Sequence, residues 1–447
     1  MDTKKHFPIL VIFKGILVFL LSACNQDYDL KSTESIQVES NISPNILMII
    51  ADDMGVDATP GYGEGSIKPH MPNLMQLQAD GLTYDNVWSN PMCAPTRATI
   101  ITGRYGINNG VLNTSNLSTL PENEITIQTY LDQELGNKYS NALIGKWHLS
   151  NNEINRPNEM GIDYFAGLIP GTVMDYNQWK LTINGHTTTS EEYITTRLTD
   201  LAIEWINVQE KPWFCWLAYT APHSPFHLPP AEMHSQINLS DKTSSIQLNP
   251  RPYYMAMIES IDYEIGRLLS QIPITVRKNT VVIFLGDNGT PGRVIQSPFL
   301  SNQSKGSLFQ GGIHVPLVVS GSGVSRKGQR DKSLINTADL FSTISQIAGV
   351  EKPQYYDSKS FYTTFFDETP SQRSFNYSEI LDFQKPAKSG YTVRNEFHKL
   401  IFLNNGISLF YDLIADPYEQ NNLMDKNLSP EEKLALEELQ AELSSIR

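Results

Sequence analysis

The sequence predicts an α/β fold in which a large, mixed but mostly parallel sheet lies between layers of helices, with a smaller antiparallel sheet and one helix at the C-terminus. Short apolar runs alternate with amphipathic helical patterns through the first three quarters of the 447 residues. Such runs are typical of strands buried on both faces of a parallel sheet. After about residue 350 they give way to strand-like segments joined by turns. We therefore expect one large domain and a smaller companion.

Residues 1–23 are predicted to be a lipoprotein signal peptide, because lysines precede an apolar run that is too short to span a bilayer. The sequence Leu21-Ser22-Ala23-Cys24 resembles the lipobox of bacterial lipoproteins, in which the cysteine is acylated. A plain signal peptide that ends near a cysteine is the alternative. Residues 24–43 are polar and suit a flexible tether. The prediction is an exported bacterial lipoprotein, anchored to a membrane through lipidated Cys24, in the periplasm or at the cell surface.

Residues 44–350 are predicted to form the large domain. Its buried strands are expected at four nearly continuous apolar runs, residues 45–50, 142–144, 214–219 and 281–285. Helices are expected between these strands. Apolar residues share one face of residues 193–207, and the same spacing returns at Ile258, Ile261, Ile265 and Leu268.

Residues 351–447 are predicted to form a smaller α+β subdomain. Three segments are typical of strands joined by turns, residues 373–380, 390–403 and 407–414. A final amphipathic helix is expected to begin at Ser429-Pro430-Glu431-Glu432, which has the spacing of a capping box.

The composition describes an ordinary globular protein. Hydrophobic residues make up 40% of the chain and charged residues 18%, which is enough apolar material to offset the entropy lost on folding. The formal net charge of -14 cannot provide the broad basic face that duplex nucleic acid requires. We expect no nucleic acid partner, and any polyanion must bind in a local pocket.

Polar side chains follow each of the four predicted strands. They are Asp52 and Asp53, Lys146 and His148, His223, and Asp287 and Asn288. Taken singly, each group has a simpler interpretation as a solvated loop, a surface group or an Asn-Gly turn. Because ligands bind at the carboxyl ends of strands in open α/β sheets, we expect these groups to converge. Three carboxylates with an amide oxygen favour Ca²⁺ or Mg²⁺ over Zn²⁺.

The three cysteines, Cys24, Cys93 and Cys215, are too few for a framework of disulfides. Cys215 lies inside an apolar run, where a cysteine behaves as a small hydrophobic residue. Cys93 opens the sequence Cys-Ala-Pro-Thr-Arg, which continues to Thr102-Gly103-Arg104. This segment resembles the signature of the formylglycine-dependent sulfatases, the type I sulfatases of the alkaline phosphatase-like superfamily.

The resemblance extends over nearly the whole mature chain. It includes the Asp-Asp pair, the Gly-Lys-Trp-His, Ala-Pro-His and Gly-Asp-Asn-Gly segments, a downstream lysine before Gln-Gly-Gly, and a Tyr-Asp-Leu and Asp-Pro-x-Glu ending. It implies the alkaline phosphatase/sulfatase-like fold, with residues 44–350 as the catalytic domain. It also implies a sulfatase that hydrolyses sulfate monoesters, and a maturation enzyme that converts Cys93 to formylglycine.

The roles of individual residues are carried over from this resemblance. Formylglycine at position 93 would be the nucleophile, and an oxygen of it would join Asp52, Asp53, Asp287 and Asn288 around a calcium ion, with magnesium as the weaker candidate. Arg97 would steady the aldehyde hydrate. Lys146 and His148 would lie beside the hydrate, and His223 and Lys305 would face the sulfate and its leaving oxygen.

Two departures from the family pattern stand out. Gln310 and His314 occupy positions where the family commonly has glutamate and arginine, which puts the local support of Lys305 in doubt. The residues that flank Asp57 also differ from the usual pattern, and we interpret this as loop variation.

The substrate is expected to be a sulfated polysaccharide or oligosaccharide. Tyr164, Tyr176 and Trp179 lie in a segment predicted to be irregular, where they could stack on sugar rings or belong to the core. Two other functions stay open. One is a formylglycine phosphonate or phosphodiester hydrolase, and the other is a non-catalytic lipoprotein that binds sulfated glycans.

Overall fold

The computed structural model describes residues 43–115, 117–383 and 386–447. The predicted signal peptide, the acylated Cys24 and the tether up to residue 42 lie outside these described residues. No helix in the described part of the chain combines the length and the apolar character needed to cross a membrane.

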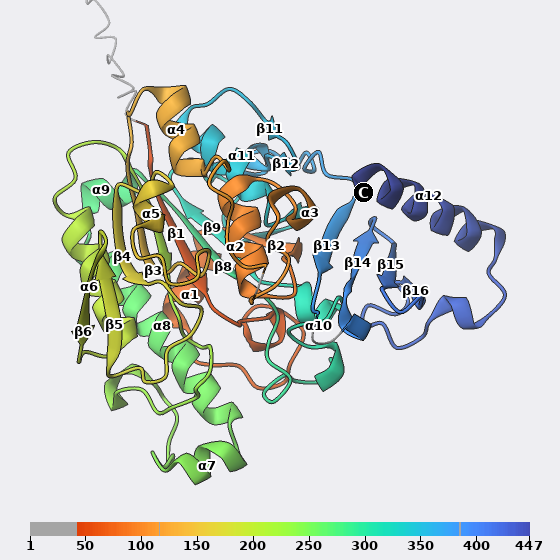
Figure 1. Ribbon diagram of the computed structural model, residues 1–447, viewed down its shortest axis with the longest axis horizontal. Helices are drawn as coiled ribbons and strands as arrows, with labels where there is room; N and C mark the ends of the chain where they lie inside the picture. The colour runs from red at the N-terminus through yellow and green to blue at the C-terminus, as the bar shows by residue number, and fades with distance from the viewer. Residues whose placement is uncertain (1–42, 116, 384–385) are drawn as a thin grey trace, which may run out of the picture. The chain divides into compact units, whose positions relative to one another are not determined.

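Five parallel strands form the middle of a ten-stranded sheet (Figure 1). In spatial order they are β8 (Thr280–Gly286), β1 (Asn45–Ala51), β7 (Trp213–Ala218), β3 (Ser140–Lys146) and β4 (Tyr164–Leu168). The four strands predicted from apolar runs are therefore confirmed as β1, β3, β7 and β8. Every residue of β1, β7 and β8 is buried, which explains why their sequences are apolar throughout.

The sheet is mixed at both sides of this parallel core. Beyond β4, the strands β5 (Trp179–Ile183) and β6 (His186–Ser190) pair antiparallel. Beyond β8, the strand β9 (Leu317–Gly321) is antiparallel to β8 and to β2 (Gly81–Trp88), and β10 (Gln329–Asn336) pairs parallel with β2 at the edge. The segment predicted to be irregular before residue 193 thus contains β4 and β5, which corrects that expectation.

Helices cover both faces of the sheet, and alternate residues of β1 point to the two helical layers. Ile46, Met48 and Ile50 join the cluster built with α2 (Cys93–Thr102), α4 (Ile127–Leu135) and α11 (Asp339–Ala348). Leu47 and Ile49 join the opposite cluster, built with α1 (Pro72–Ala79), α6 (Ile194–Ile206) and α8 (Arg251–Gln271). The two predicted helices are confirmed as α6 and α8.

The C-terminal part contains the predicted antiparallel sheet and helix. The strands follow in the order β13 (Asn376–Ile380), β14 (Gly390–Arg394), β15 (His398–Leu403) and β16 (Ser408–Asp412), and α12 (Pro430–Ile446) lies along this sheet (Figure 1). Residues 390–403 form two strands instead of one, because the Asn395 side chain accepts the N–H groups of Phe397 and His398 and closes a turn. The domain boundary near residue 350 stays a prediction.

Shorter elements connect these layers. The helices are α3 (Gly106–Asn109), α5 (Arg156–Glu159), α7 (Thr243–Leu248), α9 (Ile274–Lys278) and α10 (Gln310–Ile313), and a small hairpin joins β11 (Gln354–Tyr355) to β12 (Ser358–Lys359). Single 3-10 turns occur at Val56–Ala58, Ala231–Met233, Ser301–Gln303, Tyr362–Phe365, Pro386–Lys388 and Leu423–Asp425.

The register of the parallel strands brings their carboxyl ends together. Ala51 pairs with Gly286, and Ala218 pairs with both Ile50 and Gly145. The segments that leave these strands therefore begin at one edge of the sheet. This is where the predicted site residues lie.

The capping box of α12 is present, since the Ser429 hydroxyl accepts the Glu432 N–H and the Glu432 carboxylate accepts the Ser429 N–H. Replacing Ser429 by Ala removes one bond of this pair, which stabilises a helix by about 1 kcal/mol. We expect backbone amides of α12 to exchange with deuterium roughly five times faster in Ser429→Ala, as about 1 kcal/mol implies. Ser444→Ala, near the other end of the helix, is the matched control. Equal exchange in both variants would contradict the role of the cap.

Candidate active site

Cys93 lies at the first position of α2, and its side chain is almost completely buried, with 2% exposed. The chain enters this helix in an extended conformation at Met92. The Thr96 hydroxyl, one turn into the helix, accepts the N–H of Asn90 and ties the entering chain to α2. The helix ends at Gly103, whose φ of 65° is in the left-handed region that favours glycine. These contacts hold the cysteine at the carboxyl edge of the sheet.

Two lysine amines face two neighbouring carboxylates beside Cys93. The Lys146 amine lies 2.5 Å from Asp52 Oδ2, and the Lys305 amine lies 2.5 Å from Asp53 Oδ1. Burial opposes the charge of both amines, but the adjacent carboxylates outweigh it and raise the pKa of Lys146 and of Lys305. The Lys146 side chain is fully buried, whereas 14% of the Lys305 side chain is exposed. Both lysines therefore stay cationic, and Lys305 is the one that solvent reaches.

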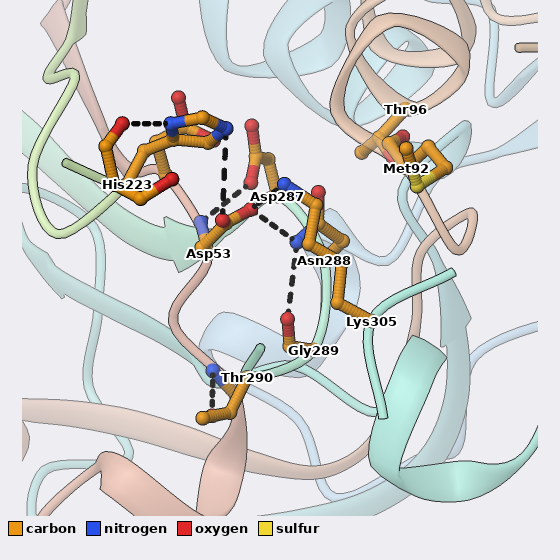
Figure 2. Close-up of polar contacts among 12 residues, drawn as sticks. Asp53, Met92, Thr96, His223, Asp287, Asn288, Gly289, Thr290 and Lys305 are labelled. Atoms are coloured by element: carbon orange, nitrogen blue, oxygen red, sulfur yellow. Dashed lines mark hydrogen bonds and ion pairs between the residues drawn. The ribbon is translucent and has the colours of Figure 1, made fainter. Parts of the chain in front are cut away.

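Asp287 and Asn288 complete the polar cluster from the end of β8. Arg97 donates to Asp287 Oδ2 at 2.8 Å and to the Lys146 carbonyl at 2.8 Å. The other oxygen of Asp287 accepts the Asp53 N–H, and the Asn288 amide donates to Asp53 Oδ1 at 2.8 Å. Figure 2 shows Asp53 between His223 and Asn288, in contact with both.

The hydrogen bonds of His223 distinguish its two ring nitrogens. Nδ1 lies 2.7 Å from the Ser224 carbonyl, which can only accept a hydrogen bond, so Nδ1 carries a proton. Nε2 lies 3.8 Å from Asp53 Oδ2 and faces the carboxylate cluster. Nε2 is therefore the nitrogen that is free to exchange a proton in the site.

His148 is held in an unusual backbone conformation, with φ of 59°, next to a glycine. A Cβ at position 171 would come within 2.3 Å of the His148 ring, so only Gly171 leaves room for the imidazole. Burial and the charges of Lys146 and Arg97 hold the pKa of His148 well below its usual range. The imidazole is therefore neutral near pH 7.

The acidic cluster fits a hard divalent cation. One ligand atom from each of Asp52, Asp53 and Cys93 lies within 4.8 Å of the others. Asp52 Oδ1 and Asn288 Oδ1 are buried without a hydrogen-bond partner among the described residues. An unpaired buried oxygen is costly, and a cation that binds oxygen ligands would satisfy both.

A supporting layer beneath this cluster was not predicted from the sequence. Asp57 is buried, accepts the Thr290 hydroxyl at 2.6 Å and accepts the Gln296 N–H at 3.0 Å. Burial raises its pKa to about 6. The Tyr254 hydroxyl on α8 donates to the Asp53 carbonyl at 2.8 Å. Asp57 thus links the segment after β1 to the segment after β8, and the interpretation of its flanking residues as loop variation stays a prediction.

The predicted sugar-stacking aromatics belong to the core. Tyr176 and Trp179 are buried, and Tyr164 packs against the Trp205 ring. The Tyr176 hydroxyl donates to the carbonyls of Thr220 and His223, and so supports the loop that carries His223. The burial of Tyr176 and Trp179 therefore favours the core interpretation over sugar stacking, whereas Tyr164 is half-buried.

The two departures near Lys305 have neutral partners. Gln310 accepts the Trp88 indole N–H at 2.8 Å, and His314 Nε2 lies 2.8 Å from the Asp85 carbonyl. Lys305 still reaches Asp53, and its backbone N–H donates to the Thr290 carbonyl at 3.1 Å. The position of Lys305 therefore does not need a charged residue at 310 or 314.

A cavity of about 340 Å³ opens beside Lys305 and Met92, the residue before Cys93. Thr114 lies on its wall, and the C-terminal part contributes Asp382 and Lys388. A larger cavity of about 920 Å³ lies between β10 and the C-terminal sheet, and none of the predicted site residues line it. The smaller cavity reaches the site at Lys305.

Comparison with known proteins matches two regions of the chain to families. Residues 44–350 match the sulfatase family, and residues 303–447 match the C-terminal region of N-sulphoglucosamine sulphohydrolase. The chain is 25% identical to the uncharacterized sulfatase YdeN of Escherichia coli (strain K12), in a match that covers 94% of this chain and 90% of that protein.

Two further proteins are similar over most of their length. The ulvan-active sulfatase of Formosa agariphila is 25% identical, in a match that covers 96% of this chain and 85% of that protein. The crystal structure of Ps i-CgsB in complex with k-i-k-neocarrahexaose has a TM-score of 0.76 and 24% identity, and covers 90% of this chain and 92% of that chain. The latter shows that the fold is shared.

Proposed function

Because the chain belongs to the sulfatase family and is a sulfuric ester hydrolase, we propose that it releases sulfate from sulfated polysaccharides or oligosaccharides by means of formylglycine at position 93 and a bound calcium ion. The observation that carries this proposal is the buried Cys93 beside two lysine–carboxylate pairs. In the overall reaction, water cleaves the ester R–O–SO₃⁻ to the alcohol R–OH and inorganic sulfate with release of a proton.

Asp52, Asp53, Asp287, Asn288 and residue 93 would hold the calcium ion, because they supply the oxygen-rich, buried ligand set described above. Calcium would neutralise charge on the sulfuryl oxygens, and the hydrated formylglycine would supply the attacking oxygen at position 93. The cysteine itself is unsuited to that role, since burial raises the pKa of its thiol.

The remaining work falls to five side chains. The amines of Lys146 and Lys305 are held cationic by Asp52 and Asp53, and they stabilise the charge that develops on the sulfate. His223 would protonate the leaving oxygen from Nε2, which must carry a second proton for this step, while the Nδ1–H stays bound to the Ser224 carbonyl. The neutral His148 is suited to accept the proton that must leave position 93 when sulfate is expelled. Arg97 donates a hydrogen bond to Asp287 Oδ2 and so holds this carboxylate in the site.

Two observations support a glycan as the alcohol. The relative from Formosa agariphila acts on ulvan, and the similar structure Ps i-CgsB holds a neocarrahexaose. The cavity beside Lys305 is near the lower end of the roughly 300–1,000 Å³ that small-ligand sites occupy. Among the described residues its lining includes hydroxyl, amide and charged groups and no aromatic side chain. A sugar would therefore be recognised there by hydrogen bonds and charge.

We further propose that the mature protein is an exported lipoprotein, anchored to a membrane through acylated Cys24 and matured by a formylglycine-generating enzyme. The lipobox-like sequence before Cys24 and the Cys-x-Pro-x-Arg sequence at Cys93 are the features that support this. Residues 24–43 would separate the catalytic part from the lipid.

Cys93→Ala is expected to abolish sulfate release, with a loss of at least a thousandfold in kcat/KM, because the oxygen nucleophile cannot form. Sulfate release from 4-nitrophenyl sulfate and from sulfated algal oligosaccharides measures this, with phosphate mono- and diesters assayed alongside. Mass spectrometry of the peptide that contains residue 93 detects formylglycine directly.

Cys215→Ala is the matched control, since Cys215 is buried in β7 and does not contribute to the site. Its activity is expected to stay near that of the wild type. Sulfate release by Cys93→Ala would contradict the proposed nucleophile. Faster turnover of phosphonate or phosphodiester substrates would favour the phosphonate or phosphodiester hydrolase, and binding of sulfated glycans without turnover would favour the binding protein.

Removal of the metal is expected to stop turnover and to be reversed by calcium. Asp52→Asn is expected to reduce the bound metal from about one ion per chain to nearly none, because it removes a charged ligand from the cluster. Elemental analysis of protein purified without chelators measures this. Asp262→Asn, which changes a buried carboxylate that accepts the Asn73 and Leu74 N–H groups, should keep its metal. Equal metal loss in both variants would exclude a specific site.

A further inference from the structure

An ion pair from the C-terminal part is buried next to the segment that carries Lys305. Lys399 lies on β15, and Glu419 lies in the loop that follows β16. The Lys399 ammonium and the Glu419 carboxylate are in contact, and their side chains are 0% and 1% exposed. Neither residue touches the metal ligands or Cys93 in any described contact. The reaction described above therefore does not use them directly.

The pair binds the segment from residue 303 to residue 310 at three points. Lys399 Nζ donates to the Leu308 carbonyl at 2.7 Å, and Glu419 Oε2 accepts the Gln310 N–H at 2.6 Å. The Glu419 carbonyl accepts the Gln303 side-chain amide at 3.2 Å. These contacts lie on both sides of Lys305 along the chain.

The same segment adjoins the two halves of the site. The Lys305 N–H donates to the Thr290 carbonyl, next to the Asn288 loop, and the Gly306 N–H donates to the Pro91 carbonyl, just before Cys93. A shift of this segment would therefore change where the Lys305 amine lies relative to both Asp53 and residue 93.

The backbone of Glu419 supports a specific role for its side chain. Its φ is 58°, in the left-handed region that a non-glycine residue adopts only at a cost. Glycine would relieve this cost, but it would remove the carboxylate that binds Gln310 and Lys399. Glu419 is strained and buried, and its carboxylate binds two partners, which indicates that the position of this carboxylate is important.

Burial of the Lys399 ammonium makes the ion pair with Glu419 a weak source of stability. Burial lowers the pKa of Lys399 to about 8 even though Glu419 opposes the shift. The ammonium lies 4.8 Å from the centroid of the Trp88 ring, whose N–H binds Gln310. A buried ion pair is often no more stabilising than apolar residues of similar size.

We propose that Lys399 and Glu419 are positioning residues that hold residues 303–310 so that the Lys305 amine meets Asp53 and the substrate sulfate. This inference rests on the proposed function, and it gives the C-terminal sheet a direct part in assembling the active site.

The test uses the double variant Lys399→Met/Glu419→Gln in the full-length, matured enzyme. Removing both charges together avoids an unpaired buried charge, so the protein is expected to fold with a melting temperature close to that of the wild type. We expect kcat/KM for 4-nitrophenyl sulfate to fall at least tenfold. In a Lys305→Ala background, the same double change should cause no further loss, because the pair acts through Lys305.

Crystal structures of the wild type and the double variant give a second readout that does not depend on residual activity. The Lys305 amine is expected to leave the Asp53 carboxylate in the variant. Arg373→Met is the matched control, since Arg373 forms another buried ion pair, with Asp339 of α11, away from residues 303–310. It should lower the melting temperature and leave kcat/KM unchanged.

Four results separate the possible failures. Full activity of the double variant, or an unmoved Lys305 amine, would overturn the inference. Additive losses in the Lys305→Ala background would also overturn it, because the pair would then act independently of Lys305. If the wild type with formylglycine and calcium released no sulfate from any ester, the proposed function itself would fail.

Discussion

The rest of the site depends on the repulsion among three buried carboxylates, Asp52, Asp53 and Asp287. Charges this close are stable in a protein interior only when opposite charges offset them. Lys146 and Lys305 each contact one of these carboxylates, and Arg97 contacts both Asp287 and Asp52, so three positive side chains offset the three negative ones. The groups that stabilise the folded site are thus the same groups that would stabilise charge on a sulfate ester. The same electrostatic interactions therefore stabilise the folded site and would bind the sulfate ester.

Much of this arrangement could be predicted from the sequence, for a definable physical reason. Parallel strands that are buried on both faces leave apolar runs, and polar residues directly after such runs must lie at one edge of the sheet. This is why Asp52, Lys146, His223 and Asp287 could be grouped from their positions in the sequence alone. Lys305 follows no strand, and only the family resemblance pointed to it. The edge strands also escaped prediction, because β6 is largely exposed and its sequence lacks an apolar run.

The supporting contacts had no local signal in the sequence. Tyr254 belongs to the apolar pattern of α8, and nothing in that pattern distinguishes a tyrosine whose hydroxyl binds the Asp53 carbonyl. Tyr176 gives a signal with two interpretations, since an aromatic residue near a site is compatible with sugar stacking and with the core. Glu419 belongs to an Asp-Pro-x-Glu sequence that carried the family resemblance, but its partner Lys399 is indicated only by the folded chain.

The burial of Cys93 has a consequence for the order of events in the life of the protein. Its sulfur lies beneath the carboxyl edge of a sheet whose central strands come from residues more than two hundred positions apart. In the folded protein only 2% of Cys93 is exposed, so little of it is accessible to a second protein. An enzyme that oxidises Cys93 must therefore find it in the newly made, still open chain. If Cys93 is matured as proposed, slow closure of the parallel sheet would lengthen the time available for that reaction, and molecules that closed first would keep the thiol.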